Sequence, residues 1–154
     1  MGDYRNNYSR HNRKGCGTYT TMENAEGFWE PKPFIMREKA KDMMAATYKM
    51  LFNFPRKYRA MSDDIKDVAL KICDYTSSLE IHGTSKRKVL TELDIANKRF
   101  QILIDIASSK DICINQNEVP PVKLEQRHKL SMMSEELGRM IGGYSKSLDA
   151  EKVK

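Results

Sequence analysis

Glycine, proline and cysteine are all scarce in this chain of 154 residues, which contains 8, 5 and 3 of them. Cys16, Cys73 and Cys113 are far apart in sequence, so they fit neither a disulfide framework nor a zinc site. Sparse glycine and proline favour helices over a turn-rich β fold. No apolar run approaches the ~20 residues of a membrane span, and the polar N-terminus lacks the features of a secretory signal. We therefore expect an all-α protein of the reducing cytoplasm that makes no contact with a membrane.

A convergent catalytic or metal-binding set is also missing from the sequence. His11, His82 and His128 do not have the spacing of a metal-ligand pair. Glu125 and His128 stand three residues apart, as in the di-metal sites of helix bundles, but a second Glu-x-x-His motif is absent. No glycine-rich phosphate loop follows a strand, because no strand pattern is present. The sequence predicts a protein that is not an enzyme and binds neither a metal nor a cofactor.

Positive charge is present in excess and is unevenly distributed. The chain has 27 Lys and Arg residues against 21 Asp and Glu residues, which gives a net charge of +6. Residues 33–60 are strongly basic, whereas residues 61–83 are acidic. Such segregation is more than solubility requires, and it favours an anionic partner over a cationic one.

Four stretches place apolar residues at three- and four-residue steps, which is typical of amphipathic helices. The predicted helices are residues 33–52, 62–81, 85–109 and 122–148. Ser62 is the expected N-cap of the second helix, and Thr84 or Ser85 that of the third. Four such helices with short connections form an up-down-up-down four-helix bundle. We assign residues 33–148 to this bundle and residues 149–154 to a charged C-terminal end.

Residues 1–32 form a basic N-terminal tail that shows no helical or strand period, so we expect it to be disordered or loosely docked. Four basic residues in its first part (Arg5, Arg10, Arg13 and Lys14) are interleaved with tyrosines. This composition suits contact with single-stranded nucleic acid, and it equally suits a solvated leader with no role. Phe28, Trp29 and Phe34 are candidates for pinning the end of the tail onto the bundle.

The third predicted helix carries two apolar stripes rather than one. Val89, Leu93 and Phe100 belong to the first stripe, which suits the core. Ile95, Ile102 and Ile106 form the second stripe, on another face of the same helix. Because no helix is central in a bundle of four, the second stripe predicts contact with another subunit.

Basic residues are clustered at three places along the helices. The clusters are Arg56, Lys57 and Arg59; Lys86, Arg87 and Lys88; and Lys98 with Arg99. Cations at the start of a helix are unfavourable beside the positive end of its dipole, and an anionic partner relieves that repulsion. An ordinary solvated face is the alternative reading of any single cluster, but together they favour salt-sensitive phosphate contacts. In an up-down bundle the first two clusters lie at opposite ends.

Three segments resemble the accessory variability protein family of diversity-generating retroelements. The segment from Asn53 to Arg59 is similar to the family's connection between its first two helices, "FP-K-x-x-R". The run from Leu93 to Ala107 is similar to its leucine-rich third helix. The segment from Glu136 to Tyr144, "ELGRMIGGY", resembles the family's "EIGRMLGGW", with isoleucine for the usual leucine and tyrosine for the usual tryptophan. The resemblance covers residues 34–147 and excludes the tail.

The resemblance implies a four-helix bundle that assembles into a ring-like homopentamer with a basic surface. It also implies a non-catalytic protein that binds the element's reverse transcriptase and its template RNA, with DNA or an RNA–cDNA hybrid as further nucleic-acid partners. Arg139 in the third segment joins the expected nucleic-acid-binding residues. Gly142, Gly143 and Tyr144 join the expected oligomer interface, and we expect the two glycines to be packing glycines.

Two hypotheses from different classes therefore stand. The first is an accessory subunit that binds nucleic acid and a reverse transcriptase. The second is a protein-only oligomeric scaffold or adaptor whose basic face binds an acidic partner. The four-helix proteins encoded in ribosomal-RNA intervening sequences are a further resembling family, although the "GRMxGG" pattern favours the retroelement family.

Overall fold

The computed structural model describes residues 33–151 of the chain, which form four long α-helices and two short 3-10 helices. The α-helices are α1 (Pro33–Leu51), α2 (Arg59–Ser78), α3 (Lys86–Ser108) and α4 (Leu124–Glu151). The 3-10 helices are η1 (Arg56–Tyr58) and η2 (Lys110–Ile112). The predicted N-terminal tail lies outside the described residues, as do residues 152–154.

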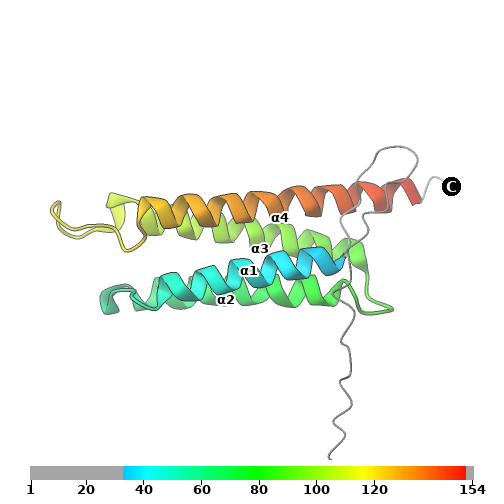
Figure 1. Ribbon diagram of the computed structural model, residues 1–154, viewed down its shortest axis with the longest axis horizontal. Coiled ribbons are helices and arrows are strands. Elements are labelled where there is room, and N and C mark those ends of the chain that lie inside the picture. The colour runs from blue at the N-terminus through cyan, green and yellow to red at the C-terminus, as the bar shows by residue number, and fades with distance from the viewer. Residues whose placement is uncertain (1–32, 152–154) are drawn as a thin grey trace, which may run out of the picture.

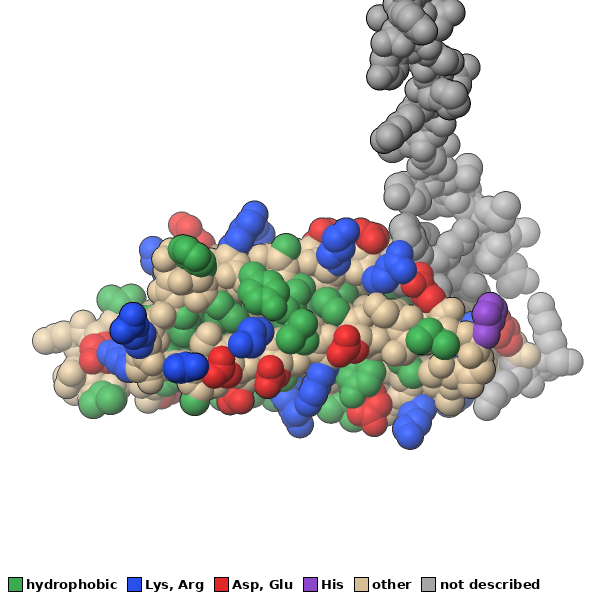
Figure 2. Space-filling view, turned by 90° about the horizontal axis from the view of Figure 1, so that it is seen from below, with side chains coloured by type: hydrophobic (Ala, Val, Ile, Leu, Met, Phe, Trp, Pro, Cys, Tyr) green, Lys and Arg blue, Asp and Glu red, His purple; other side chains and the backbone are tan. Residues whose placement is uncertain are grey.

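The four helices pack side by side in alternating directions, as predicted (Figure 1). Each helix packs against the next one in sequence, and α4 closes the bundle against α1. The connections over residues 52–58 and 109–123 lie together at one end, which we call the two-loop end. The connection over residues 79–85 lies at the opposite end, the one-loop end, beside the start of α1 and the end of α4. Seen from the α2 side, the surface mixes hydrophobic and charged side chains (Figure 2).

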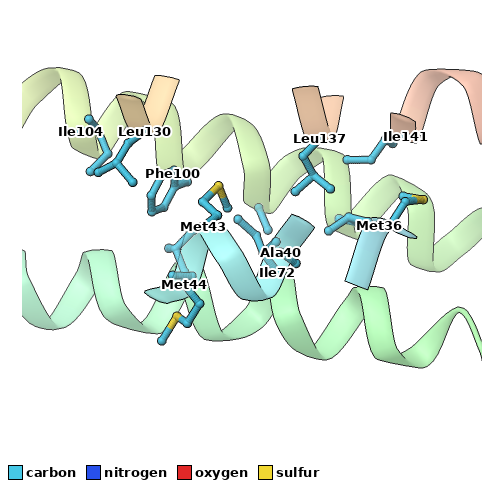
Figure 3. Packing of buried hydrophobic residues seen from close by; sticks show 14 of the residues in the cluster. Met36, Ala40, Met43, Met44, Ile72, Phe100, Ile104, Leu130, Leu137 and Ile141 are labelled. Atoms are coloured by element: carbon cyan, nitrogen blue, oxygen red, sulfur yellow. The ribbon is translucent and has the colours of Figure 1, made fainter. Parts of the chain in front are cut away.

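The predicted apolar stripes form the core between the helices. Met36, Ala40 and Met43 of α1 face Ile72 of α2 and Phe100 of α3 across the centre of the bundle (Figure 3). The stripes of the four helices supply most of the side chains that are almost fully buried, as predicted: Met36, Met43, Ile65, Ile72, Leu79, Leu93, Phe100, Leu130 and Leu137. Burial of this apolar surface is the main favourable term that holds the helices together.

Several predicted helix boundaries differ from the structure, including the end of the second helix, at Ser78 instead of residue 81, and the start of the fourth, at Leu124 instead of residue 122. The second helix begins at Arg59 instead of Ser62, because the 3-10 turn η1 already winds the chain and leads directly into α2. Ser62 is therefore inside the helix and is not its N-cap. The fourth helix continues to Glu151, so residues 149–151 belong to the bundle's last helix and not to a separate charged end. Gly83 has a φ of +83°, a left-handed conformation that favours glycine in the turn before α3.

A buried polar pair sets the register of α3 against α4. Asn97 Nδ2 donates a hydrogen bond of 2.9 Å to the carbonyl of Ser134, and Ser134 Oγ donates one of 2.6 Å to Asn97 Oδ1. A Cβ atom on Gly138, one turn further along α4, would lie 3.4 Å from Asn97 Nδ2. That distance is an ordinary van der Waals contact, so an alanine would also fit beside the asparagine. The pair satisfies polar groups that would be costly to bury alone.

Gly142 does not have the packing role within the bundle that the sequence suggested. The residue is exposed, and a Cβ atom built on it would meet nothing within 4 Å. We predict that Gly142→Ala raises the free energy of unfolding by about 0.5–1 kcal/mol, because alanine lowers the entropy cost of forming the helix. Denaturant titration would measure this, and a destabilised variant would contradict the open space at this position.

Candidate nucleic-acid and oligomer interfaces

The first basic cluster lies at the two-loop end. A glutamate of the neighbouring α3–α4 connection neutralises part of its charge. Lys57 Nζ forms an ion pair of 2.7 Å with Glu118 of the α3–α4 connection. Tyr58 is buried, and its hydroxyl donates to the same carboxylate at 3.4 Å. Asn115 Nδ2 donates to the other carboxylate oxygen at 3.1 Å. We call these four residues the loop clamp, because they tie the two connections together.

Within the loop clamp, the carboxylate of Glu118 compensates the positive charge of Lys57. The hydrogen bond from Lys57 holds the pKa of Glu118 below its ordinary value, and the bond to Glu118 raises the pKa of Lys57. Burial raises the pKa of Tyr58, so its hydroxyl stays protonated. Arg56 is exposed and has no ion pair within residues 33–151, whereas Arg59 lies 3.9 Å from Asp63. Arg56 is therefore the most available cation of this cluster.

We predict that Glu118→Gln loosens the two-loop end without unfolding the bundle. Amide exchange in residues 52–58 and 109–123 should accelerate, and the melting temperature should fall slightly, because exposed ion pairs contribute little. The clamp contributes its full stabilisation of the folded protein above pH 4.5, the ordinary pKa of Glu118. This contribution is lost as pH falls through the lower pKa that Glu118 has in the folded protein. At alkaline pH the same contribution to stability is lost as pH rises through the raised pKa of Lys57, whose ordinary value is 10.5.

The matched control for the clamp is Glu135→Gln, which neutralises an exposed carboxylate in the middle of α4 that has no ion pair within the described residues. Hydrogen exchange that accelerates equally in both variants, or in neither, would contradict the clamp.

The second basic cluster begins α3 at the one-loop end. Lys86, Arg87 and Lys88 are all exposed, and the first turn of α3 holds no acidic residue. Ser85 occupies the N-cap position, as one of the two predicted alternatives, but its side chain makes no capping hydrogen bond. Arg87 forms an ion pair with Asp149 of α4. Lys86 and Lys88 have no ion pair within residues 33–151, so they remain beside the positive end of the helix dipole.

The remaining predicted cations are exposed along the middle of the bundle. Lys98 pairs with Asp94 one turn earlier on α3, at 2.6 Å. Arg99 on α3 and Arg139 on α4 are exposed, and neither forms an ion pair within the described part of the chain. The first two clusters lie at opposite ends of the molecule, as predicted (Figure 1). The structure therefore does not bring the predicted nucleic-acid-binding residues together into one compact patch on a single chain.

The second stripe of α3 is exposed on the single chain. Ile95, Ile102 and Ile106 are 50%, 58% and 44% exposed, although each is a large hydrophobic residue. Lys88 and Arg99 fall on the same helical face by their spacing and are also exposed. We call this face of α3 the isoleucine face. Two predicted nucleic-acid-binding residues thus share a helix face with the predicted oligomer contact.

The C-terminal segment is placed differently from the prediction. Tyr144 is only 9% exposed and belongs to the hydrophobic core, so it is not available as an interface residue. The reason is its position on the inward stripe of α4, one turn after Met140 and Ile141. Gly142 is exposed on the other side of the helix, and Gly143 is half-exposed. A contact of these glycines with another subunit stays a prediction.

Comparison of the chain with protein-family models, with curated proteins and with solved structures gives no match. Family membership therefore stays a hypothesis that depends on the three resembling segments. Among residues 33–151, no group of three or more His, Cys, Asp or Glu side chains is placed to hold a metal ion. None of the described helices is long and apolar enough to cross a membrane.

Sequence reasoning missed the acidic partners that neutralise part of each basic cluster. Tyr58 and Glu118 are 60 positions apart, and Arg87 and Asp149 are 62 positions apart. No local pattern in the sequence marks such pairs. A weak signal was available in the topology, because an up-down bundle brings its first and third connections to the same end.

Proposed function

We propose that this protein is a non-catalytic accessory subunit of a diversity-generating retroelement. In this role it binds the reverse transcriptase and the template RNA, and it supports synthesis of mutated cDNA. The observation that carries the proposal is the set of exposed cations that have no ion pair in the described residues and lie outside the isoleucine face: Arg56, Lys86 and Arg139. Such cations can bind phosphates by releasing counterions from the nucleic acid.

The same proposal includes assembly into a ring-like homopentamer. Support comes from the isoleucine face, because three large apolar side chains on one exposed helix face favour contact with protein. A ring repeats each basic cluster around its axis. Contacts that are weak on one chain then add by avidity, which offsets the separation of the two clusters.

A gel-shift titration with labelled RNA tests the proposal directly. We expect a complex whose affinity falls steeply as salt rises, with little dependence on sequence. Parallel titrations with duplex DNA and an RNA–cDNA hybrid would show which nucleic acid is preferred. The absence of a shift at low salt with all three probes would contradict nucleic-acid binding.

The second candidate function is a protein-only scaffold, which the isoleucine face supports as well as it supports the first. An exposed apolar helix face is buried by contact with protein and does not bind the phosphates of a nucleic acid. In that case the chain would be oligomeric and would shift none of the labelled nucleic acids. The exposed cations would then bind an acidic protein partner.

A further inference from the structure

An apolar groove runs along the outside of the bundle between α1 and α2. It is lined by Arg37, Lys41, Met44, Ala45 and Tyr48 from α1 and by Cys73 and Ser77 from α2. Met44 is buried, whereas Tyr48, at the end of the groove nearest the end of α1, is 48% exposed. Burial also raises the pKa of the Cys73 thiol, so it stays neutral. Hydrophobic side chains gather along the middle of the surface on this side (Figure 2).

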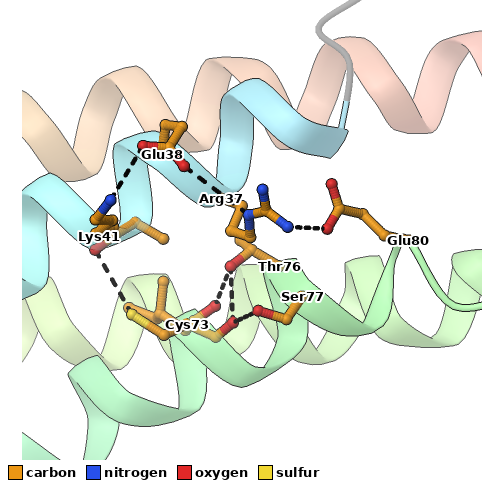
Figure 4. Close-up of polar contacts among 9 residues, drawn as sticks. Arg37, Glu38, Lys41, Cys73, Thr76, Ser77 and Glu80 are labelled. Atoms are coloured by element: carbon orange, nitrogen blue, oxygen red, sulfur yellow. Dashed lines mark hydrogen bonds and ion pairs between the residues drawn. The ribbon is translucent and has the colours of Figure 1, made fainter. Parts of the chain in front are cut away.

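Cations border this groove, and no carboxylate lines it. Arg37 pairs with Glu80 and Glu38 at the end of the groove nearest the start of α1 (Figure 4). Lys41 Nζ lies 3.5 Å from Glu38, and the lysine side chain is 74% exposed. This loose, solvent-screened pair leaves Lys41 able to contact a second anion. The groove therefore fits a segment that is apolar and carries negative charge.

Residues 23–30, which Pro31 and Lys32 separate from α1, have this composition. Glu23, Glu26 and Glu30 are the charged residues between positions 23 and 30, and Phe28 and Trp29 stand among them. Trp29 is the single tryptophan of the chain. The acidic, aromatic segment contrasts with residues 1–22, which are basic. Its charge complements the border of the groove, and its rings match the apolar lining.

The length of chain before α1 also matches the groove. Phe28 lies five residues before Pro33, a reach of about 17 Å in an extended chain that folds back along the helix. Met44 lies eleven residues after Pro33, which is about 17 Å along α1. Phe28 can therefore reach the part of the groove beside Met44, and Trp29, with a reach of about 14 Å, can reach the part beside Lys41, about 12 Å along α1. A segment attached this closely docks at high effective concentration.

We propose that residues 23–30 of this chain fold back along α1 and occupy the α1–α2 groove. Phe28 packs against Met44, Trp29 packs into the groove between Lys41 and Cys73, and a glutamate of the segment contacts Lys41. The docked segment shields an apolar surface that is separate from the isoleucine face of α3. It leaves the basic residues of the tail free to act on other partners.

Fluorescence of Trp29 in the full-length protein tests the proposal, because no other tryptophan contributes. Excitation at the red edge of the absorption band avoids the tyrosines. We expect blue-shifted emission and an acrylamide quenching constant several-fold below that of a free tryptophan peptide. Ala45→Glu introduces bulk and like charge into the groove at an exposed helical position, so it should red-shift the emission and restore most of the quenching. Ser77→Glu tests the same effect from the α2 wall.

The matched control is Ala60→Glu, an exposed alanine on α2 that does not line the groove, which should leave the emission unchanged. Circular dichroism would confirm that each variant retains its helices. A wild-type Trp29 that is fully exposed, or shielded but insensitive to both groove variants, would overturn the proposal. Shielding that disappears on dilution would also overturn it, because the occupant would then be the segment of a second copy.

Discussion

Replacing Ile102 by aspartate should convert an oligomer of this protein into a monomer of 17.8 kDa. Ile102 is the most exposed of the three residues of the isoleucine face, so the change removes no core contact and should shift the stability of the single chain by less than about 0.5 kcal/mol. In an interface the variant loses the burial of an isoleucine, worth up to about 1.5–3 kcal/mol. It also forces a carboxylate out of water, which costs several kcal/mol more.

Light scattering at micromolar concentration would measure the mass of the wild type and the variant. The control is Ile81→Asp, which places the same charge on a similarly exposed isoleucine (59%) outside the isoleucine face. Ile81→Asp should keep the wild-type mass. A wild-type protein that is monomeric at micromolar concentration, or an Ile102→Asp variant that keeps its oligomeric mass, would rule out this face as the interface.

Neutralising Lys86, Arg87 and Lys88 together should weaken RNA binding across all sequences. Each lost phosphate contact lowers the slope of log affinity against log salt by about 0.7–0.9, so the triple glutamine variant should lose about two units. Arg87 already pairs with Asp149, and we therefore expect Lys86→Gln with Lys88→Gln to produce most of the loss. The helices should remain folded, because exposed charges contribute little to stability.

The control for this variant neutralises three exposed lysines outside the predicted nucleic-acid-binding residues: Lys71, Lys129 and Lys146. It removes the same net charge, so it separates a local contact from a general loss of positive charge. Equal losses of affinity and salt slope in both triple variants would contradict a specific role for the start of α3. RNA binding would then depend on net charge, with Arg56 and the N-terminal tail as the next candidates.

The core and the topology could be predicted from the sequence because helical periodicity reports burial directly. Ile65, Ile72 and Leu93 stand on predicted stripes, and each is fully or almost fully buried. The second stripe of α3 was also predicted correctly to be exposed on a lone bundle. These features depend on residues three or four positions apart, and the spacing of apolar residues over that range can be read from one sequence alone.

Features that depend on distant residues could not be predicted in the same way. Tyr144 is on the apolar stripe of α4 and is buried as its spacing indicates, but the sequence does not show that Gly142 beside it meets open space. The buried Asn97–Ser134 pair joins residues 37 positions apart, and no local pattern marks it. The available charge of the first two basic clusters also depends on distant partners, Glu118 in the α3–α4 connection and Asp149 on α4.

We propose that this protein binds a retroelement reverse transcriptase and its template RNA. The most direct measurement is co-expression of the full-length chain with a candidate reverse transcriptase and template RNA, followed by purification through a tag on the enzyme. We predict a complex that contains all three components, with several copies of this chain for each enzyme, and that loses the chain at high salt. A chain that elutes alone at low salt, bound to neither the enzyme nor the RNA, would contradict the proposed function.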